Sequence, residues 1–273
     1  MALSADAGDE IFGGYNRYGY LRKIQQTFKY FPSFLTGIAS GAMNAVNISA
    51  IPYIKDSPGL VNRYKMMSDT IHTKNIFAQN DILLSSYKRK QLDRMLKPGK
   101  YHNTKTYFDS RDLINDNNDD FSKILAMDYK TYLADDILVK VDRSSMSVAL
   151  EGREPFLDHR IIEWVAQLPM NLKIRGKEKK YLLKNIAHRY IPEEMLRKPK
   201  MGFGIPMMIW FKDELKELIN EFLSEDALRR NEFLNASYIL RLKKKFLENP
   251  NEEEAHKMWL PLMFQMWWKR WMD

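Results

Sequence analysis

The stretch SADAGDEIFGGYNRY, residues 4–18, stands almost at the start of the chain. The residues MALS read as the end of a strand, and the small residues after them give way near Asp9 to a helical run. The pattern therefore predicts a strand, a tight loop that carries Asp6, and a helix. Such a loop presents backbone N–H groups to an anion, and Asp9 and Glu10 could hold a divalent cation there. In a simpler interpretation the two acids are helix N-terminal charges, and Gly13–Gly14 only allows close packing.

A second stretch, DDILVKVDRSSMSVALEGREPFLDHRIIEW at residues 135–164, mixes charges with apolar residues at helical spacing. A helix here places Asp135 and Asp142 near one face and Lys140 on another. We therefore expect charges buried among apolar neighbours, where they need partners or ligands. Asp158 is expected to cap the helix that follows.

A third stretch, LRKPKMGFGIPMMIWF at residues 196–211, has basic residues flanking a glycine-containing loop in front of a helix. Arg197 and Lys200 are of the types that reach phosphate oxygens. A basic loop near a glycine is common, so this pattern alone has low specificity.

Most of the remaining sequence has apolar residues three or four apart, which predicts helices with one buried face each, at residues 122–133, 159–168 and 206–223. The run NDNNDD, residues 115–120, indicates a surface turn with a helix cap. The C-terminal run KMWLPLMFQMWWKRWMD holds four of the six tryptophans. We expect it to be a last helix, kinked at Pro261, whose aromatic face docks into a helical core. An interfacial membrane helix and a partner-binding stripe are the alternatives.

The composition narrows the classes of function. The chain has 273 residues, 45% of them hydrophobic, and no cysteine, which excludes disulfides, thiolate metal sites and a cysteine nucleophile within it. The five histidines are scattered, so no histidine-based metal site is expected. We find no leader or membrane-spanning run and expect a cytoplasmic protein without membrane binding. The net charge is +8, but the basic residues are dispersed among acids, so no nucleic-acid binding is expected.

The three stretches, together with GKEKKYLLKNIAHRYIPEEML at residues 176–196, resemble the C-terminal half of the synthetase domain of the glutamine-hydrolysing asparagine synthetase family. The resemblance covers essentially the whole chain and is tightest in residues 3–18, 129–163 and 176–211. It implies a mainly α-helical fragment of an α/β, adenine-nucleotide-hydrolase-like synthetase domain of the PP-loop ATPase type.

The resemblance implies an ATP-dependent carbon–nitrogen ligase. In that family the side-chain carboxylate of aspartate attacks the α-phosphate of ATP, which gives an acyl-adenylate and pyrophosphate. Ammonia, derived from glutamine in the parent enzyme, then displaces AMP and forms asparagine. ATP, Mg²⁺, aspartate or a related carboxylate, and ammonia are thus the implied ligands. Related proteins amidate sugar acids or close β-lactam rings, so the acceptor stays open, and a non-catalytic helical interaction protein is the other alternative.

The resemblance also assigns roles to residues. Asp9 corresponds to a magnesium ligand; the nucleotide-binding residues are Ser4, Ala5 and Gly8; and the catalytic residues are Lys200, Asp6 and Glu10. Asp6 would handle the ammonia proton or position the intermediate.

The sequence departs from the family pattern at two motifs. Family members usually carry glycine where this chain has Ala5 and Ala7, and if either position needs a positive φ, the Cβ costs about 1 kcal/mol or more. The segment EGREPFLD also differs from the common EVRVPFLD, with Gly152 and Glu154 in place of valines.

Two family features are missing from the sequence. The S-G-G-x-D-S loop that binds pyrophosphate in the family does not occur in the 273 residues, nor does the N-terminal cysteine that hydrolyses glutamine. We therefore expect residues 1–273 to be the C-terminal part of a longer synthetase domain, with weak or no ATP turnover alone. We also expect an exposed apolar face, which would favour aggregation or a homodimer.

Overall fold

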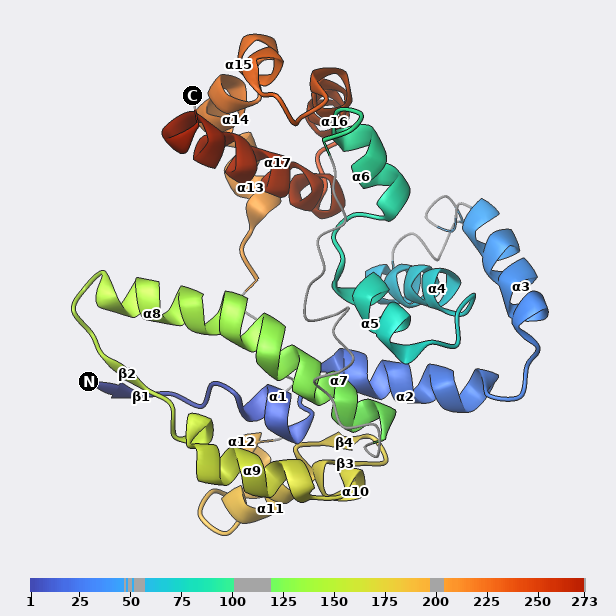
Figure 1. Cartoon of the computed structure of the whole chain (residues 1–273), viewed down its shortest axis with the longest axis vertical. Coiled ribbons are helices and arrows are strands. Elements are labelled where there is room, and N and C mark those ends of the chain that lie inside the picture. Colours follow the sequence, from blue (N-terminus) through green and yellow to red (C-terminus); the bar gives the residue numbers. More distant parts are fainter. Residues whose placement is uncertain (47, 49–50, 52–56, 101–118, 197–203, 273) are drawn as a thin grey trace. The chain divides into compact units, whose positions relative to one another are not determined.

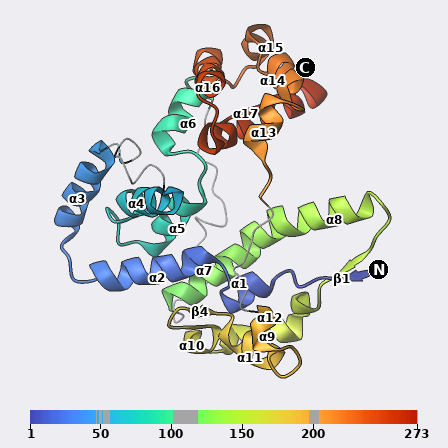
Figure 2. The ribbon, with the colours of Figure 1, turned by 180° about the vertical axis from the view of Figure 1, so that it is seen from behind.

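The computed structural model describes residues 1–46, 48, 51, 57–100, 119–196 and 204–272. The chain divides into two compact units: unit 1 comprises residues 1–84 and 105–198, and unit 2 comprises residues 85–104 and 199–273. Helices dominate the described residues of both units, as predicted (Figure 1; Figure 2 gives the view from behind).

Unit 1 contains two short strand pairs among helices. Its elements, in chain order, are β1 (Ala2–Leu3), α1 (Gly8–Phe12), α2 (Asn16–Phe28), α3 (Ser33–Ala45), α4 (Pro58–Thr70), α5 (Ile76–Leu84), α7 (Asp120–Asp128), the π-helix η3 (Tyr129–Ile137), α8 (Leu138–Met146), β2 (Gly152–Arg153), the 3₁₀ turn η4 (Pro155–Leu157), α9 (His159–Gln167), α10 (Met170–Lys173), β3 (Ile174–Arg175), β4 (Glu178–Lys179), α11 (Tyr181–Ala187) and α12 (Glu193–Leu196).

The strand pairs join segments that are distant in sequence. β1 runs parallel to β2, with Ala2 opposite Gly152 and Leu3 opposite Arg153, so the first and second stretches of the sequence meet. The predicted strand at the N-terminus is thus confirmed, whereas its partner, 150 residues away, was not predicted. β3 and β4 form an antiparallel hairpin.

The segment α7–η3–α8 is one helical run in Figure 1. It begins where Asp119 caps α7 by accepting hydrogen bonds from the N–H groups of Phe121 and Ser122, so the predicted cap in the NDNNDD run is confirmed; residues 115–118 lie outside the described part. The expectation of buried charges is wrong, because Asp135, Lys140 and their charged neighbours are exposed and α8 has no buried residue. α8 is amphipathic in spacing, yet all of its charged side chains remain in solvent.

Two apolar clusters form the core of unit 1. One centres on Tyr18, Leu21, Ile124 and Ile174, and the other on Ile11, Phe12 and Val165. The first joins α2 to α7, and the second joins α1 to α9. The predicted buried faces of residues 122–133 and 159–168 therefore both contribute to the core that holds the N-terminal loop.

Unit 2 is wholly helical in its named elements, which are α6 (Arg89–Met95), α13 (Met207–Lys212), α14 (Lys216–Phe222), α15 (Glu225–Arg230), α16 (Ala236–Glu248) and α17 (Glu252–Trp271). The predicted last helix is confirmed: Met258, Leu262 and Trp268 of α17 lie in the core, and Pro261 is buried within the helix. The predicted single helix over residues 206–223 is wrong in one respect. It begins after Pro206, as expected, but breaks at Asp213, whose ψ of −90° is not helical.

No helix in the described residues is long and apolar enough to cross a membrane.

Candidate active site

The loop between β1 and α1 folds on its own side chains. The hydroxyl of Ser4 donates to Oδ2 of Asp6 at 2.5 Å, and Ser4 Oγ also accepts from the Asp6 N–H at 3.4 Å. Ala7, at the N-cap of α1, has φ 70° and is buried, whereas Ala5 does not have a positive φ. Of the two alanines that replace family glycines, Ala7 is therefore the one that occupies the left-handed region, where a Cβ is unfavourable.

Asp9 forms an ion pair across the fold. Its Oδ1 lies 3.0 Å from Nζ of Lys180, with side chains only 22% and 28% exposed respectively. Lys180 precedes α11 and has φ 53°, an uncommon conformation for a residue other than glycine. The segment of residues 176–196, which also resembles the family, thus contributes a cation to the loop. We did not predict this partner; the lysines in the segment GKEKK were its only signal.

The two glycines after α1 have separate structural reasons. Gly13 ends α1 with φ 69°, and a Cβ there would meet the Ile174 side chain at 2.8 Å. Gly14 lies against the ion pair: a Cβ would come within 1.8 Å of Asp9 Oδ1 and 2.3 Å of Lys180 Cε. The GG pair therefore allows a left-handed helix end and leaves room for the carboxylate and its lysine, so the packing interpretation of these glycines is confirmed.

Glu10 does not share the surroundings of Asp9. It is 1% exposed and accepts a hydrogen bond from the Tyr15 hydroxyl at 2.5 Å. Burial raises the pKa of Glu10 above its ordinary value, while the hydrogen bond from Tyr15 opposes the shift. Adjacent residues on a helix point in different directions, so the two carboxylates are not positioned as a joint cation site in this structure.

A cage of aromatic side chains surrounds Arg17 next to Glu10. The guanidinium lies 4.3 Å from the centre of the Tyr15 ring, with the rings of Tyr18 and Tyr132 at 5.1 and 5.4 Å. It pairs at 2.7 Å with Asp128, which is fully buried and also accepts from the Tyr18 hydroxyl. Arg17 and Asp128 were missed in the sequence; an aspartate on the apolar face of residues 122–133 was the available signal.

The second stretch, residues 135–164, packs against the start of α1 and so supports the loop between β1 and α1. Phe156 of the EPFLD segment meets Phe12 of α1 edge to face, with ring centres 5.9 Å apart, and a Cβ on Gly8 would touch the same Phe156 ring at 3.4 Å. Asp158 caps α9 by accepting from the Arg160 N–H at 2.9 Å, as predicted. The start of α1 therefore packs directly against the second stretch, at a distance that leaves only ordinary van der Waals contact for a Cβ at position 8.

The structure thus pairs Ser4 with Asp6 and Asp9 with Lys180, and it buries Glu10. Lys200 and Arg197 lie outside the described residues. In the described part of the chain no group of three or more acidic, histidine or cysteine side chains could hold a metal ion. A magnesium ion at Asp9 would therefore depend on this one partly exposed carboxylate together with oxygens from a phosphate ligand.

Comparison with known proteins decides the family. The family model described as asparagine synthase matches residues 1–269. This chain belongs to the asparagine synthase family. It is 26% identical over 269 residues to asparagine synthetase [glutamine-hydrolyzing] 1 of Bacillus subtilis (strain 168), which covers 98% of the chain and 40% of the relative.

Other members of the family match in the same region. A putative asparagine synthetase [glutamine-hydrolyzing] of Mycobacterium tuberculosis is 25% identical over 98% of the chain and 39% of its own length. The human asparagine synthetase [glutamine-hydrolyzing] is 36% identical over 107 residues, 37% of the chain and 18% of its own length. The chain therefore spans about 40% of the length of the first relatives it matches. No solved structure matches the chain.

Proposed function

We propose that this asparagine synthase chain supplies part of an active site that joins ammonia to the side-chain carboxylate of aspartate at the expense of ATP. Aspartate oxygen attacks the α-phosphate, pyrophosphate leaves, and ammonia then displaces AMP from the acyl-adenylate to give asparagine and a proton. The observation that supports this is the loop of residues 4–9, in which Asp9 is held between Lys180 and Gly14 in the region matched by the family model.

Asp9 is the residue proposed to hold Mg²⁺. Its carboxylate is partly exposed and is an oxygen donor of the kind Mg²⁺ prefers, which fits the ion, whereas Glu10 is buried and bonded to Tyr15. Mg²⁺ bound there would reduce negative charge on the phosphates. Lys180 holds the Asp9 carboxylate in place and offsets its charge, and Gly14 provides the space that both side chains need.

The remaining loop residues are assigned by their surroundings. Ser4, Ala5 and Gly8 are proposed to approach the nucleotide through the backbone of the loop. The Ser4 hydroxyl orients the carboxylate of Asp6, which would accept the proton released as ammonia attacks. Glu10 is 1% exposed, so we propose that it acts through Tyr15 as a positioning residue. Lys200 is proposed to stabilise charge at the reacting phosphate.

The test is an assay of AMP formation from ATP in the presence of Mg²⁺, aspartate and ammonia. The 273-residue chain is assayed alone and mixed with a separately expressed segment of the Bacillus subtilis relative, taken from the part that this chain does not match, as the proposed source of the S-G-G-x-D-S loop. We expect no aspartate-dependent AMP from the chain alone, and both AMP and asparagine from the mixture. Strong turnover by the chain alone would contradict the proposed need for that loop.

Variants assign the chemistry to residues. In the mixture, Asp9→Asn and Lys200→Ala should each lower turnover by about 100-fold or more, the scale seen when one transition-state contact is lost. Asp213→Asn changes an exposed aspartate of unit 2 and is the matched control, which should leave turnover unchanged. Full activity of Lys200→Ala would show that the basic loop is structural. A panel of sugar-acid carboxylates in place of aspartate tests the acceptor.

A further inference from the structure

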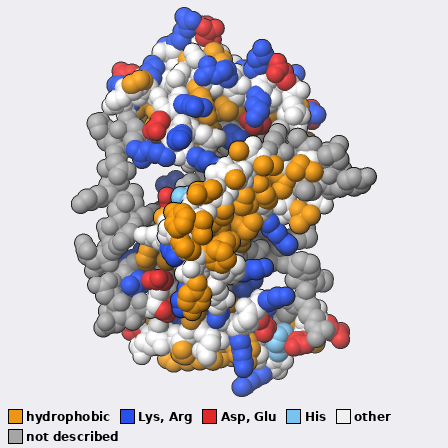
Figure 3. Space-filling view, turned by 90° about the vertical axis from the view of Figure 1, so that its right-hand side faces the viewer, with side chains coloured by type: hydrophobic (Ala, Val, Ile, Leu, Met, Phe, Trp, Pro, Cys, Tyr) orange, Lys and Arg blue, Asp and Glu red, His pale blue; other side chains and the backbone are white. Residues whose placement is uncertain are grey.

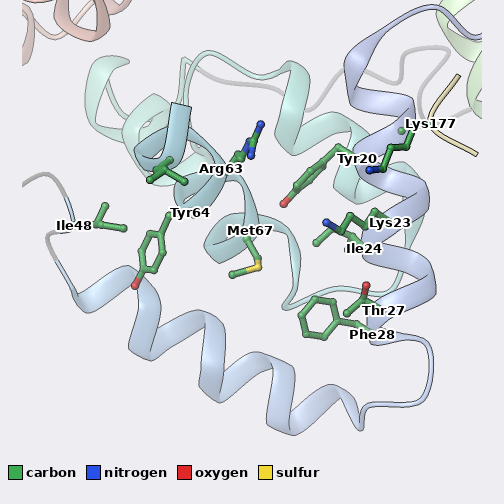
Figure 4. A pocket seen from close by; sticks show the side chains of 12 residues that line it. Tyr20, Lys23, Ile24, Thr27, Phe28, Ile48, Arg63, Tyr64, Met67 and Lys177 are labelled. Atoms are coloured by element: carbon green, nitrogen blue, oxygen red, sulfur yellow. The ribbon is translucent and has the colours of Figure 1, made fainter. Parts of the chain in front are cut away.

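A cavity lies in unit 1, and it shares no described residue with the loop of residues 4–9. Its volume is about 800 Å³, within the range of roughly 300–1,000 Å³ typical of small-molecule sites. Residues of α2 and α4 form most of its wall, with Ile48 and Lys177 completing it (Figure 4). The cavity therefore lies among helices that carry none of the proposed catalytic residues.

The wall of this cavity is largely apolar. Ile24 and Ile48 are buried, whereas Phe28, Tyr64 and Met67 are half-buried and line the space. Aromatic rings and a flexible thioether accommodate an aromatic or branched apolar group without demanding one shape. The wall thus favours a ligand with an apolar body.

The charges on the wall all have one sign. Lys23, Arg63 and Lys177 line the cavity, and no aspartate or glutamate occurs among its described lining residues. In the part of the chain that the structure describes, none of these three cations forms a hydrogen bond or an ion pair. In Figure 4, Arg63, Tyr20 and Lys177 lie along the upper part of the view, with Lys23 below Lys177. Ile48 and Tyr64 lie at the left, and Phe28 lies at the lower right, below Lys23.

Tyr20 adds a polar group to the wall, between Arg63 and Lys177 in Figure 4. Its pKa is raised chiefly by burial, and the charge of Asp69 contributes further, whereas its hydrogen bond with Thr70 lowers it. Tyr20 therefore stays a neutral phenol at neutral pH and adds no negative charge to the wall. Asp69 is not among the described lining residues.

We propose that this cavity binds a small amphipathic organic anion, with its acid group at Lys23, Arg63 and Lys177 and its apolar body against Phe28, Tyr64 and Met67. The cations select an anion because the lining offers them no protein carboxylate. Exposed cations contribute little affinity in water, so the apolar wall must supply much of the binding free energy.

The test uses the anionic dye 8-anilinonaphthalene-1-sulfonate with the complete chain, followed by its fluorescence. The neutral dye N-phenyl-1-naphthylamine is the comparison. We expect saturable binding of the anionic dye at one site. Arg63→Gln and Lys177→Gln should each weaken it by about threefold to tenfold while affecting the neutral dye little, since about 1.4 kcal/mol corresponds to tenfold. Met67→Trp fills the cavity and should weaken both dyes.

A matched control separates the cavity from exposed apolar surface. Phe34→Ser combined with Ile38→Ser changes the exposed face of α3, whose side chains do not line the cavity. This variant should retain saturable binding of the anionic dye. Loss of binding in the α3 variant, or unchanged affinity in both charge variants and in Met67→Trp, would overturn the proposal. Circular dichroism of each variant confirms that it is folded.

Discussion

At the residue scale, Gly14 has the least room for a side chain among the described glycines. A Cβ there would overlap the Asp9–Lys180 pair, whereas a Cβ on Gly19, one turn into α2, meets nothing within 4 Å. Gly14→Ala should therefore destabilise the chain by about 2 kcal/mol, within the cost of forcing atoms into a packed site. Gly19→Ala should stabilise it by roughly 0.5–1 kcal/mol. Urea unfolding measures both, and equal effects would contradict the close packing at Gly14.

Glu10 gives a pH-dependent prediction. Burial raises its pKa in the folded chain above the ordinary 4.5, so the folded state binds this proton more tightly than the unfolded one. Ionisation of Glu10 therefore lowers the free energy of unfolding as the pH rises from 4.5 through the folded-state pKa. Glu10→Gln removes this titration and should be more stable than wild type at pH 7, with the difference shrinking at pH 4.

Urea unfolding of both chains at the two pH values measures that difference. Glu163→Gln, at an exposed position on α9, is the matched control and should follow the wild type throughout. A Glu10→Gln variant that is less stable than wild type at pH 7 would show that the Tyr15 hydrogen bond outweighs the cost of burial.

The sequence predicted those interactions that form between residues close together in the chain. Asp119 and Asp158 cap helices within three residues of themselves, and both were found from residue type and position alone. Lys180 lies 171 positions after Asp9 in the sequence, and no local pattern encodes such a contact. The same reason explains why Asp128 was missed as the partner of Arg17. Family likeness indicated the chemistry, but only the fold shows which side chains meet.

At the scale of elements, helix periodicity predicted which faces are buried better than where helices end. Val165 and Ile124 are fully buried, as their spacing indicated. The run from Pro206 breaks at Asp213 although its apolar spacing continues, because α13 and α14 each pack separately against α17. The end of α13 is thus set by packing against α17, a contact that the sequence pattern does not predict.

Two leucines of α17 allow a test of how far the burial of a side chain determines its contribution to the free energy of unfolding. Leu262 is fully buried, whereas Leu260, two residues earlier, is 44% exposed. Leu262→Ala should cost about 2–5 kcal/mol, because it removes transfer free energy and leaves a cavity in the core of unit 2. Leu260→Ala should cost less than about 1 kcal/mol. Urea unfolding followed by tryptophan fluorescence measures the two, and similar losses would contradict the docking of this face.

At the scale of the whole molecule, net charge and exposed apolar surface have opposite effects on the association of copies of the chain. The side chains of Tyr30, Phe34 and Ile38 at and before α3 are 85%, 67% and 67% exposed. Figure 3 shows hydrophobic side chains gathered on the side of the molecule where α3 lies. Apolar surface of this kind favours association, while a net charge of +8 keeps copies of the chain apart.

Salt should therefore decide the oligomeric state. Raising the ionic strength from 0.05 to about 0.5 M shortens the Debye length from above 10 Å to below it, so repulsion between copies weakens while apolar contact does not. We expect the weight-average mass, measured by sedimentation velocity, to rise with salt. Phe34→Ser with Ile38→Ser should suppress that rise. Leu247→Ser with Leu260→Ser, at exposed apolar positions of unit 2, is the matched control and should not. A mass that falls as salt increases would mean that ion pairs, and not the α3 face, hold the copies together.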